Sequence, residues 1–126
     1  MIADADSGRV FYERAVREGD TFSITFVHSV NNSPVTDVFR IEGGARIRPV
    51  QARYSAFGAG MPDALGEGLT LSREGADMVV TGFTRTEGEL RYIVGTVSDH
   101  VLSIQGREVS LRDMCGKNAH IVLSIK

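Results

Sequence analysis

The clearest hydrophobic pattern in the chain is a two-residue alternation over residues 20–30. Its apolar phase, interrupted by one histidine, consists of Phe22, Ile24, Phe26, His28 and Val30. A period of two with one apolar face is typical of a half-buried β-strand. Because the other phase is mostly threonine and serine, the pattern predicts a strand with one face toward the core and one toward water.

A second alternating segment begins at Val35, directly after an Asn-Asn-Ser-Pro sequence. Asparagine, serine and proline favour turns, so the two segments predict a β-hairpin. If Val30 pairs with Val35, then His28 lies opposite Asp37. Directly opposed side chains have Cβ atoms about 4.5–5.5 Å apart. We therefore expect the two polar residues of the inward face to contact each other.

Further short β-type segments follow at regular intervals, and none keeps the 3.6-residue period of an amphipathic helix. Pro49 predicts an edge or a bulge in its segment, because proline has no N–H. The pattern predicts one all-β domain over residues 1–126, a small antiparallel β-barrel or β-sandwich of about 8–10 short strands with little or no helix. Besides the hairpin, the expected strands are residues 9–17, 45–55, 69–73, 77–84, 90–97, 101–104, 108–111 and 119–126, with a loop at 113–118.

Length and charge narrow the function classes. A chain of 126 residues suffices for one domain. Its net charge is −2 and it has no cluster of lysine and arginine, which argues against nucleic acid as a partner. No apolar run is long enough to insert in a bilayer. The N-terminal Met-Ile-Ala-Asp-Ala-Asp is not a signal peptide, and it suits both a mature chain without its leader and a cytosolic start.

The His28–Asp37 pair has two interpretations. An imidazole oriented by a carboxylate can bind a ligand or a metal, or transfer a proton. Alternatively, the two buried polar groups satisfy each other and fix the hairpin register. Under either interpretation, removing Asp37 alone is expected to be more damaging than removing both residues, because His28 would be left unpaired.

Residues 56–68 show no alternation, and a long structureless loop in a compact domain is often functional. Its glycine-rich part can form a nest of backbone N–H groups for an anion, or the glycines can simply supply unusual backbone angles. If this loop folds over His28, Asp63 joins the same site. The ligand-binding candidates are His28, Asp37, Phe57, Gly58, Gly60 and Asp63.

No cofactor or metal is predicted, because no spacing of histidine and cysteine matches a structural zinc site. A divalent-ion site built from His28, Asp37 and Asp63 is the alternative. Cys115 is the single cysteine, so the chain cannot form an internal disulfide. We interpret it and His120 as an unrelated thiol and imidazole, and His100 as a surface residue.

Three groups of residues together carry a family resemblance. They are Gly19-Asp20-x-Phe22 with Phe26-Val27-His28-Ser29-Val30, then Pro34-Val35-x-Asp37-x-Phe39, and then Ser55-x-Phe57-Gly58-Ala59-Gly60-Met61-Pro62. In this order they resemble the bacterial family known as domain of unknown function 1850. The resemblance covers roughly Arg17–Pro62. The family more often has glutamate where this chain has Asp37.

The resemblance implies a small all-β domain that is usually exported behind a leader. Genes of this family often lie beside tripartite ATP-independent periplasmic (TRAP) transporters of the TAXI type, which move small organic solutes. The location it implies is therefore periplasmic or otherwise extracytoplasmic. The family has no established activity, so His28, Asp37, Gly58 and Gly60 carry over as recurrent positions without assigned roles.

These observations favour a non-enzymatic accessory or ligand-binding module that works with such a transporter. Its expected partners are a solute-binding or membrane subunit of the transporter and a small organic ligand. One alternative is a small hydrolase or isomerase with His28 as a general base oriented by Asp37. Another is a structural or oligomerising β-domain with exposed strand edges at residues 45–55 or 119–126.

Overall fold

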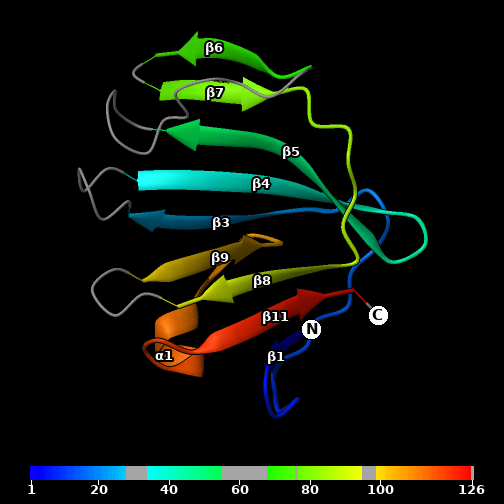
Figure 1. Cartoon of the computed structure of the whole chain (residues 1–126), viewed down its shortest axis with the longest axis vertical. Coiled ribbons are helices and arrows are strands. Elements are labelled where there is room, and N and C mark those ends of the chain that lie inside the picture. Colours follow the sequence, from blue (N-terminus) through cyan, green and yellow to red (C-terminus); the bar gives the residue numbers. More distant parts are fainter. Residues whose placement is uncertain (28–33, 55–67, 76, 95–98, 126) are drawn as a thin grey trace.

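The computed structural model describes residues 1–27, 34–54, 68–75, 77–94 and 99–125. Two antiparallel sheets pack in a sandwich-like arrangement rather than a closed barrel, which confirms the all-β prediction (Figure 1). The elements are β1 Ile2–Asp4, β2 Val10–Tyr12, β3 Thr21–Val27, β4 Pro34–Glu42, β5 Arg46–Tyr54, β6 Thr70–Glu74, β7 Asp77–Thr81, β8 Glu89–Ile93, β9 His100–Ile104, β10 Arg107–Ser110, α1 Leu111–Cys115 and β11 His120–Ser124.

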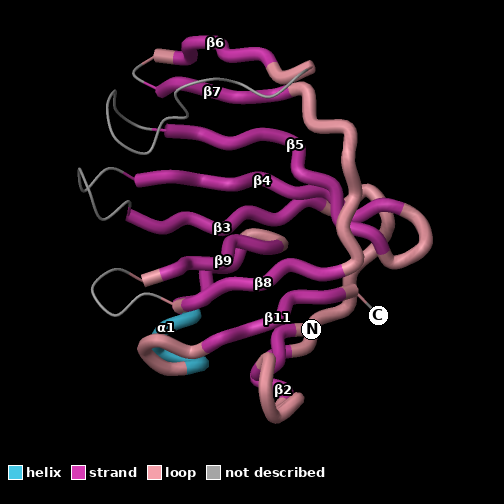
Figure 2. Tube along the Cα trace, in the orientation of Figure 1, coloured by secondary structure: helices cyan, strands magenta, loops and turns pink. Residues whose placement is uncertain are grey.

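The larger sheet has the strand order β10-β9-β3-β4-β5-β7-β6, and the smaller sheet has the order β2-β1-β11-β8. Figure 2 shows β6 and β7 at one end of the molecule and β1, β8 and β11 toward the other. Because β11 lies between β1 and β8, the prediction of an exposed edge at residues 119–126 is wrong. β5 is also internal over Ala52–Tyr54, where it pairs with β7 as well as β4.

The β3–β4 register differs from the register predicted for this hairpin. Ile24 pairs with Asp37, and Phe22 pairs with Phe39. The residue opposite Asp37 is therefore Ile24 and not His28, a shift of four positions (28 − 24). The shift is even, so the apolar phase still faces the core. The observed register stacks the rings of Phe22 and Phe39, whose centroids are 5.3 Å apart.

Of the edge or bulge predicted at Pro49, the structure has a bulge. Val38 pairs with Gln51 while its neighbour Phe39 pairs with Pro49, so β5 has one extra residue at this point. A bulge of this kind accommodates the missing N–H of proline and bends the strand.

The hydrophobic core lies between the two sheets and draws on both. Ile24 and Ile47 of the larger sheet and Ile121 of the smaller sheet have no solvent exposure. Other members are Ile2, Phe22, Phe39, Ile41, Val94, Leu102, Ile104, Leu111 and Leu123. The core therefore requires both sheets, because each supplies only one apolar face.

The N-terminal end of the chain departs from the sequence prediction. The strand expected over residues 9–17 is limited to β2, and residues 2–4 form the unpredicted β1, which pairs with β11. Within residues 13–17, the Ala15 carbonyl instead accepts a hydrogen bond from Nε2 of Gln105 at 2.9 Å. A side chain distant in sequence thus takes the place of a strand partner.

A short helix, α1, occupies part of the predicted 113–118 loop. Its N-cap is Ser110, whose Oγ accepts a hydrogen bond from the Asp113 amide at 3.1 Å. Asp99 accepts a second bond from the Arg112 amide at 2.8 Å. These two caps satisfy amides that a helix leaves without partners. Within the described ranges, no helix has the length and apolar character needed to cross a membrane.

Gly82 starts the connection from β7 to β8 at a point of close backbone approach. A Cβ atom on Gly82 would lie 2.4 Å from the Gly68 carbonyl oxygen, and Gly82 has a φ of +96°. Gly106 has a φ of +78° but open space around its Cβ position. We expect Gly82→Ala to reduce the free energy of unfolding by about 1–3 kcal/mol more than Gly106→Ala, because only the first adds a clash. Urea denaturation of both variants measures the difference, and equal losses would contradict this packing.

Candidate functional site

The carboxylate of Asp37 is placed in the middle of the larger sheet, on the face that packs against the core. Asp37 lies on β4 between Ile24 of β3 and Ala52 of β5. It is half-buried, and its burial raises the pKa of the carboxyl group. In the described part of the chain, no hydrogen bond or ion pair reaches this carboxylate. Such a group is costly to the fold, which makes it a candidate for function.

Asp37 lines a cavity of about 250 Å³ between the two sheets. Three aromatic side chains, Phe39, Phe83 and Tyr92, share this cavity with it. The remaining lining residues are Pro49, Gln51, Ala52, Arg85, Glu87, Leu90 and Arg91. We refer to this space as the Asp37 cavity. It combines one carboxylate with aromatic and aliphatic walls.

The arginines at the rim of the Asp37 cavity are paired with glutamates on their own segments. Arg85 forms an ion pair with Glu87 at 3.3 Å, and Arg91 forms one with Glu89 at 3.0 Å. Both arginine side chains are mainly exposed. Because neither arginine pairs with Asp37, neither neutralises its carboxylate.

The connection between β7 and β8 closes one side of the Asp37 cavity and is fixed to β5. Ile47 and Glu87 exchange two backbone hydrogen bonds, of 2.8 and 2.7 Å. Arg46 adds bonds from Nε to the Thr86 hydroxyl at 3.2 Å and from Nη2 to the Thr86 carbonyl at 2.9 Å. The wall that carries Phe83 is therefore anchored at its far end by four hydrogen bonds.

The negative charge on Asp37 affects the pKa values of two tyrosines. Burial raises the pKa values of Tyr92 and Tyr54, and the negative charge of Asp37 raises both further. The two phenols thus stay protonated at neutral pH and keep their ability to donate a hydrogen bond. Tyr92 comes from β8 of the smaller sheet, so this environment forms only when the sheets pack together.

His100 belongs to the same aromatic group, and its prediction as a surface residue is wrong. Its ring stacks on Phe26 with a centroid distance of 5.1 Å and meets Tyr92 edge-on at 5.7 Å. Burial lowers the pKa of His100, while nearby Asp99 partly opposes this change. The sequence contains a signal of this burial, because His100 shares its alternation phase with the buried Leu102.

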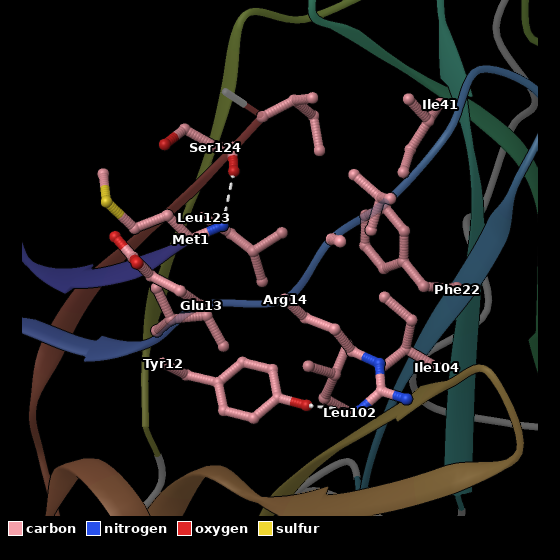
Figure 3. Close-up of a pocket in the computed structure, with 14 residues that line it drawn as sticks. Met1, Tyr12, Glu13, Arg14, Phe22, Ile41, Leu102, Ile104, Leu123 and Ser124 are labelled. Atoms are coloured by element: carbon pink, nitrogen blue, oxygen red, sulfur yellow. Dashed lines mark hydrogen bonds between the residues drawn. The ribbon is translucent and has the colours of Figure 1, made fainter.

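A second cavity, of about 370 Å³, also lies between the sheets. Figure 3 shows Tyr12, Arg14, Phe22 and Ile104 around it. The other lining residues are Met1, Ile2, Glu13, Ala15, Val16, Ile41, Leu102, Leu123, Ser124 and Ile125. We refer to it as the Arg14 cavity. Phe22 lines this cavity and its stacking partner Phe39 lines the Asp37 cavity, so the stacked pair contributes one ring to each.

Asp37 is the one predicted site residue that the described ranges include. His28 lies in residues 28–33, and the other predicted positions lie in residues 55–67, both outside those ranges. These other positions are Phe57, Gly58, Gly60 and Asp63. The observed register removes the direct cross-strand pairing of His28 with Asp37. Among described residues, no group of three or more His, Cys, Asp or Glu side chains is arranged to hold a metal ion.

Cys115 has the properties of a structural thiol. It lies half-buried at the end of α1, and burial raises its pKa. The exposed His120 is the first residue of β11. Because the thiolate is the reactive form, we expect Cys115 in the folded protein to react with Ellman's reagent several-fold more slowly than in the urea-unfolded chain. A faster reaction in the folded protein would contradict this assignment.

Comparison with known proteins gives one match. The model of a family described as a domain of unknown function (DUF1850) matches residues 22–111. The matched range starts in β3 and ends at the first residue of α1, so it contains every residue that lines the Asp37 cavity. The comparisons with curated proteins and with solved structures gave no match.

Proposed function

The chain belongs to the domain of unknown function 1850 family, and from this membership and the Asp37 cavity we propose a non-enzymatic, extracytoplasmic module that binds a small organic solute. The single observation that carries the proposal is the carboxylate of Asp37. It stands without a hydrogen-bond or ion-pair partner among the described residues, and it faces a cavity with room for a small ligand.

The chemistry of the Asp37 cavity favours an ammonium group on an apolar body. A carboxylate forms strong charge-assisted hydrogen bonds with an ammonium. The faces of aromatic rings such as Phe39, Phe83 and Tyr92 attract the same cation. Leu90 and Ala52 supply apolar surface for the rest of the ligand. One ligand would thus satisfy the carboxylate and fill the cavity.

Binding is favoured over catalysis by the surroundings of Asp37. A catalytic pair needs a nucleophile and a base within hydrogen-bond reach of each other. In the described part of the chain, no hydroxyl, thiol or imidazole forms a hydrogen bond with this carboxylate. The groups that the described residues place in the cavity are suited to recognition, and they support binding.

The partner that we propose is a TAXI-type TRAP transporter, and the location is periplasmic. This part rests on the family resemblance, because genes of the family often lie beside those transporters. A module that binds a solute cation could deliver it to the solute-binding subunit or sense its concentration. Mixing the purified chain with the solute-binding subunit, with and without the ligand, tests the association by analytical ultracentrifugation.

The test of ligand binding is an amide NMR titration with benzylammonium and with benzyl alcohol, its neutral counterpart. We expect saturable shifts at Asp37, Phe39 and Tyr92 with the ammonium and much weaker changes with the alcohol. Equal responses to both compounds would contradict recognition by the carboxylate. Shifts spread over the exposed acidic residues would indicate non-specific attraction and would also contradict the proposal.

A further inference from the structure

The Arg14 cavity is a separate space from the Asp37 cavity and has a different chemistry. Both sheets contribute to its apolar floor, through Ile2 and Leu123 on one side and Phe22, Ile41 and Ile104 on the other. Its volume of about 370 Å³ lies at the small end of the range for ligand sites, roughly 300–1,000 Å³. The floor is suited to an apolar body of modest size.

The guanidinium of Arg14 supplies a cation at this floor. Figure 3 shows the side chain extending between Tyr12 and Phe22, while Glu13 points away from it. Nε donates to Oε1 of Gln105, and Nη1 lies 3.4 Å from the Tyr12 hydroxyl. A guanidinium has five N–H donors, so three remain for another acceptor. No carboxylate among the described residues forms an ion pair with Arg14.

The position of Arg14 is fixed by the turn between β9 and β10. Gln105 accepts from Arg14 and donates from Nε2 to the Ala15 carbonyl at 2.9 Å. One side chain thus holds both the guanidinium and the backbone beside it. A cation held in place before binding loses less entropy when a ligand arrives.

From this arrangement we propose that the Arg14 cavity binds a small organic carboxylate with an apolar body. The carboxylate would accept two parallel hydrogen bonds from the free guanidinium N–H groups, a geometry that arginine favours. The apolar body would lie against Phe22, Ile41 and Ile104. This site is separate from the ammonium site proposed at Asp37, because no residue lines both cavities.

The test uses 3-phenylpropionate, with 3-phenylpropanol as the neutral analogue, and titration calorimetry on the whole chain. Arg14→Gln is expected to raise the Kd for the carboxylate at least about tenfold, because it removes a charge-assisted pair. Arg14→Lys keeps the charge but not the paired donors, so its Kd should lie between those of Arg14→Gln and the unchanged protein. Arg17→Gln is the matched control, since Arg17 is exposed and lines neither cavity.

For 3-phenylpropionate, we expect Arg17→Gln to have a Kd within about twofold of that of the unchanged protein. Asp37→Asn should bind this carboxylate fully, and 3-phenylpropanol should bind the unchanged protein only weakly. The last variant separates this site from the ammonium site. Equal losses in Arg14→Gln and Arg17→Gln would overturn the proposal, because they would indicate general attraction to positive charge. Absence of carboxylate binding to a folded protein would also overturn it. So would amide NMR shifts that 3-phenylpropionate causes at Tyr92 rather than at Tyr12 and Phe22.

Discussion

Replacing Phe39 with alanine is expected to lower the free energy of unfolding by about 3–5 kcal/mol. Phe39 is 6% exposed and stacks on Phe22 in the middle of the core. The substitution removes buried apolar surface and leaves a void that adds to the Asp37 cavity, so little of the loss can be recovered by collapse. Urea denaturation followed by circular dichroism measures the change.

The control for Phe39→Ala is Ile93→Ala on β8. Ile93 is 55% exposed although it lies on a strand of the smaller sheet. Its truncation should change stability by no more than about 0.5 kcal/mol. Similar effects of the two substitutions would contradict the placement of the Phe22–Phe39 pair between the sheets.

Asp37→Asn is expected to stabilise the protein at neutral pH. Burial raises the pKa of Asp37 above its ordinary value of 3.8. Folding therefore favours the protonated carboxyl group more than the unfolded chain does, and the stability contributed by protonation is lost as pH rises through the folded pKa. An amide of the same shape avoids the cost of the buried charge. A gain of about 1 kcal/mol would raise the melting temperature by roughly 2–8 °C.

The pH dependence of this gain provides its own check. Below pH 3.8 the aspartate is protonated in both the folded and the unfolded chain, so the advantage of asparagine should disappear there. Asp6→Asn, at an exposed position in the turn after β1, is the control and should change stability by no more than about 0.5 kcal/mol at neutral pH. A loss of stability in Asp37→Asn at neutral pH would show that the carboxylate has a stabilising partner. That is the direction expected from the sequence alone, which paired Asp37 with His28.

The faces of the strands could be predicted from the sequence, while the register of the central hairpin could not. A two-residue period fixes which side chains share a face, and this survives any even shift between strands. Phe22 is therefore correctly predicted to face the core, and Phe39 shares the inward phase of Asp37 two residues before it. Their pairing depends on ring stacking between β3 and β4 and on the length of the connection, which alternation does not encode. The predicted His28–Asp37 pairing failed for this reason.

The two cavities could not be predicted, because each joins segments that are distant in sequence. The Asp37 cavity needs β8 of the smaller sheet opposite β4 of the larger one, and the Arg14 cavity needs β1 and β11 opposite β3 and β9. Strand order across two sheets decides these neighbours. Asp37 itself was identified, because a charged residue interrupts an apolar phase. Arg14 has no such signal, since it lies in residues 9–17, for which the sequence predicts an ordinary strand.

The most direct measurement of the central claim is the affinity of benzylammonium for Asp37→Asn and Asp6→Asn, each compared with the unchanged protein by titration calorimetry. We predict a Kd raised at least about tenfold in Asp37→Asn, because a hydrogen bond to a charged group contributes about 1.5–3 kcal/mol. Asp6→Asn should bind as the unchanged protein does. Equal affinity in Asp37→Asn and the unchanged protein would contradict the assignment of Asp37 as the recognition group of a ligand site.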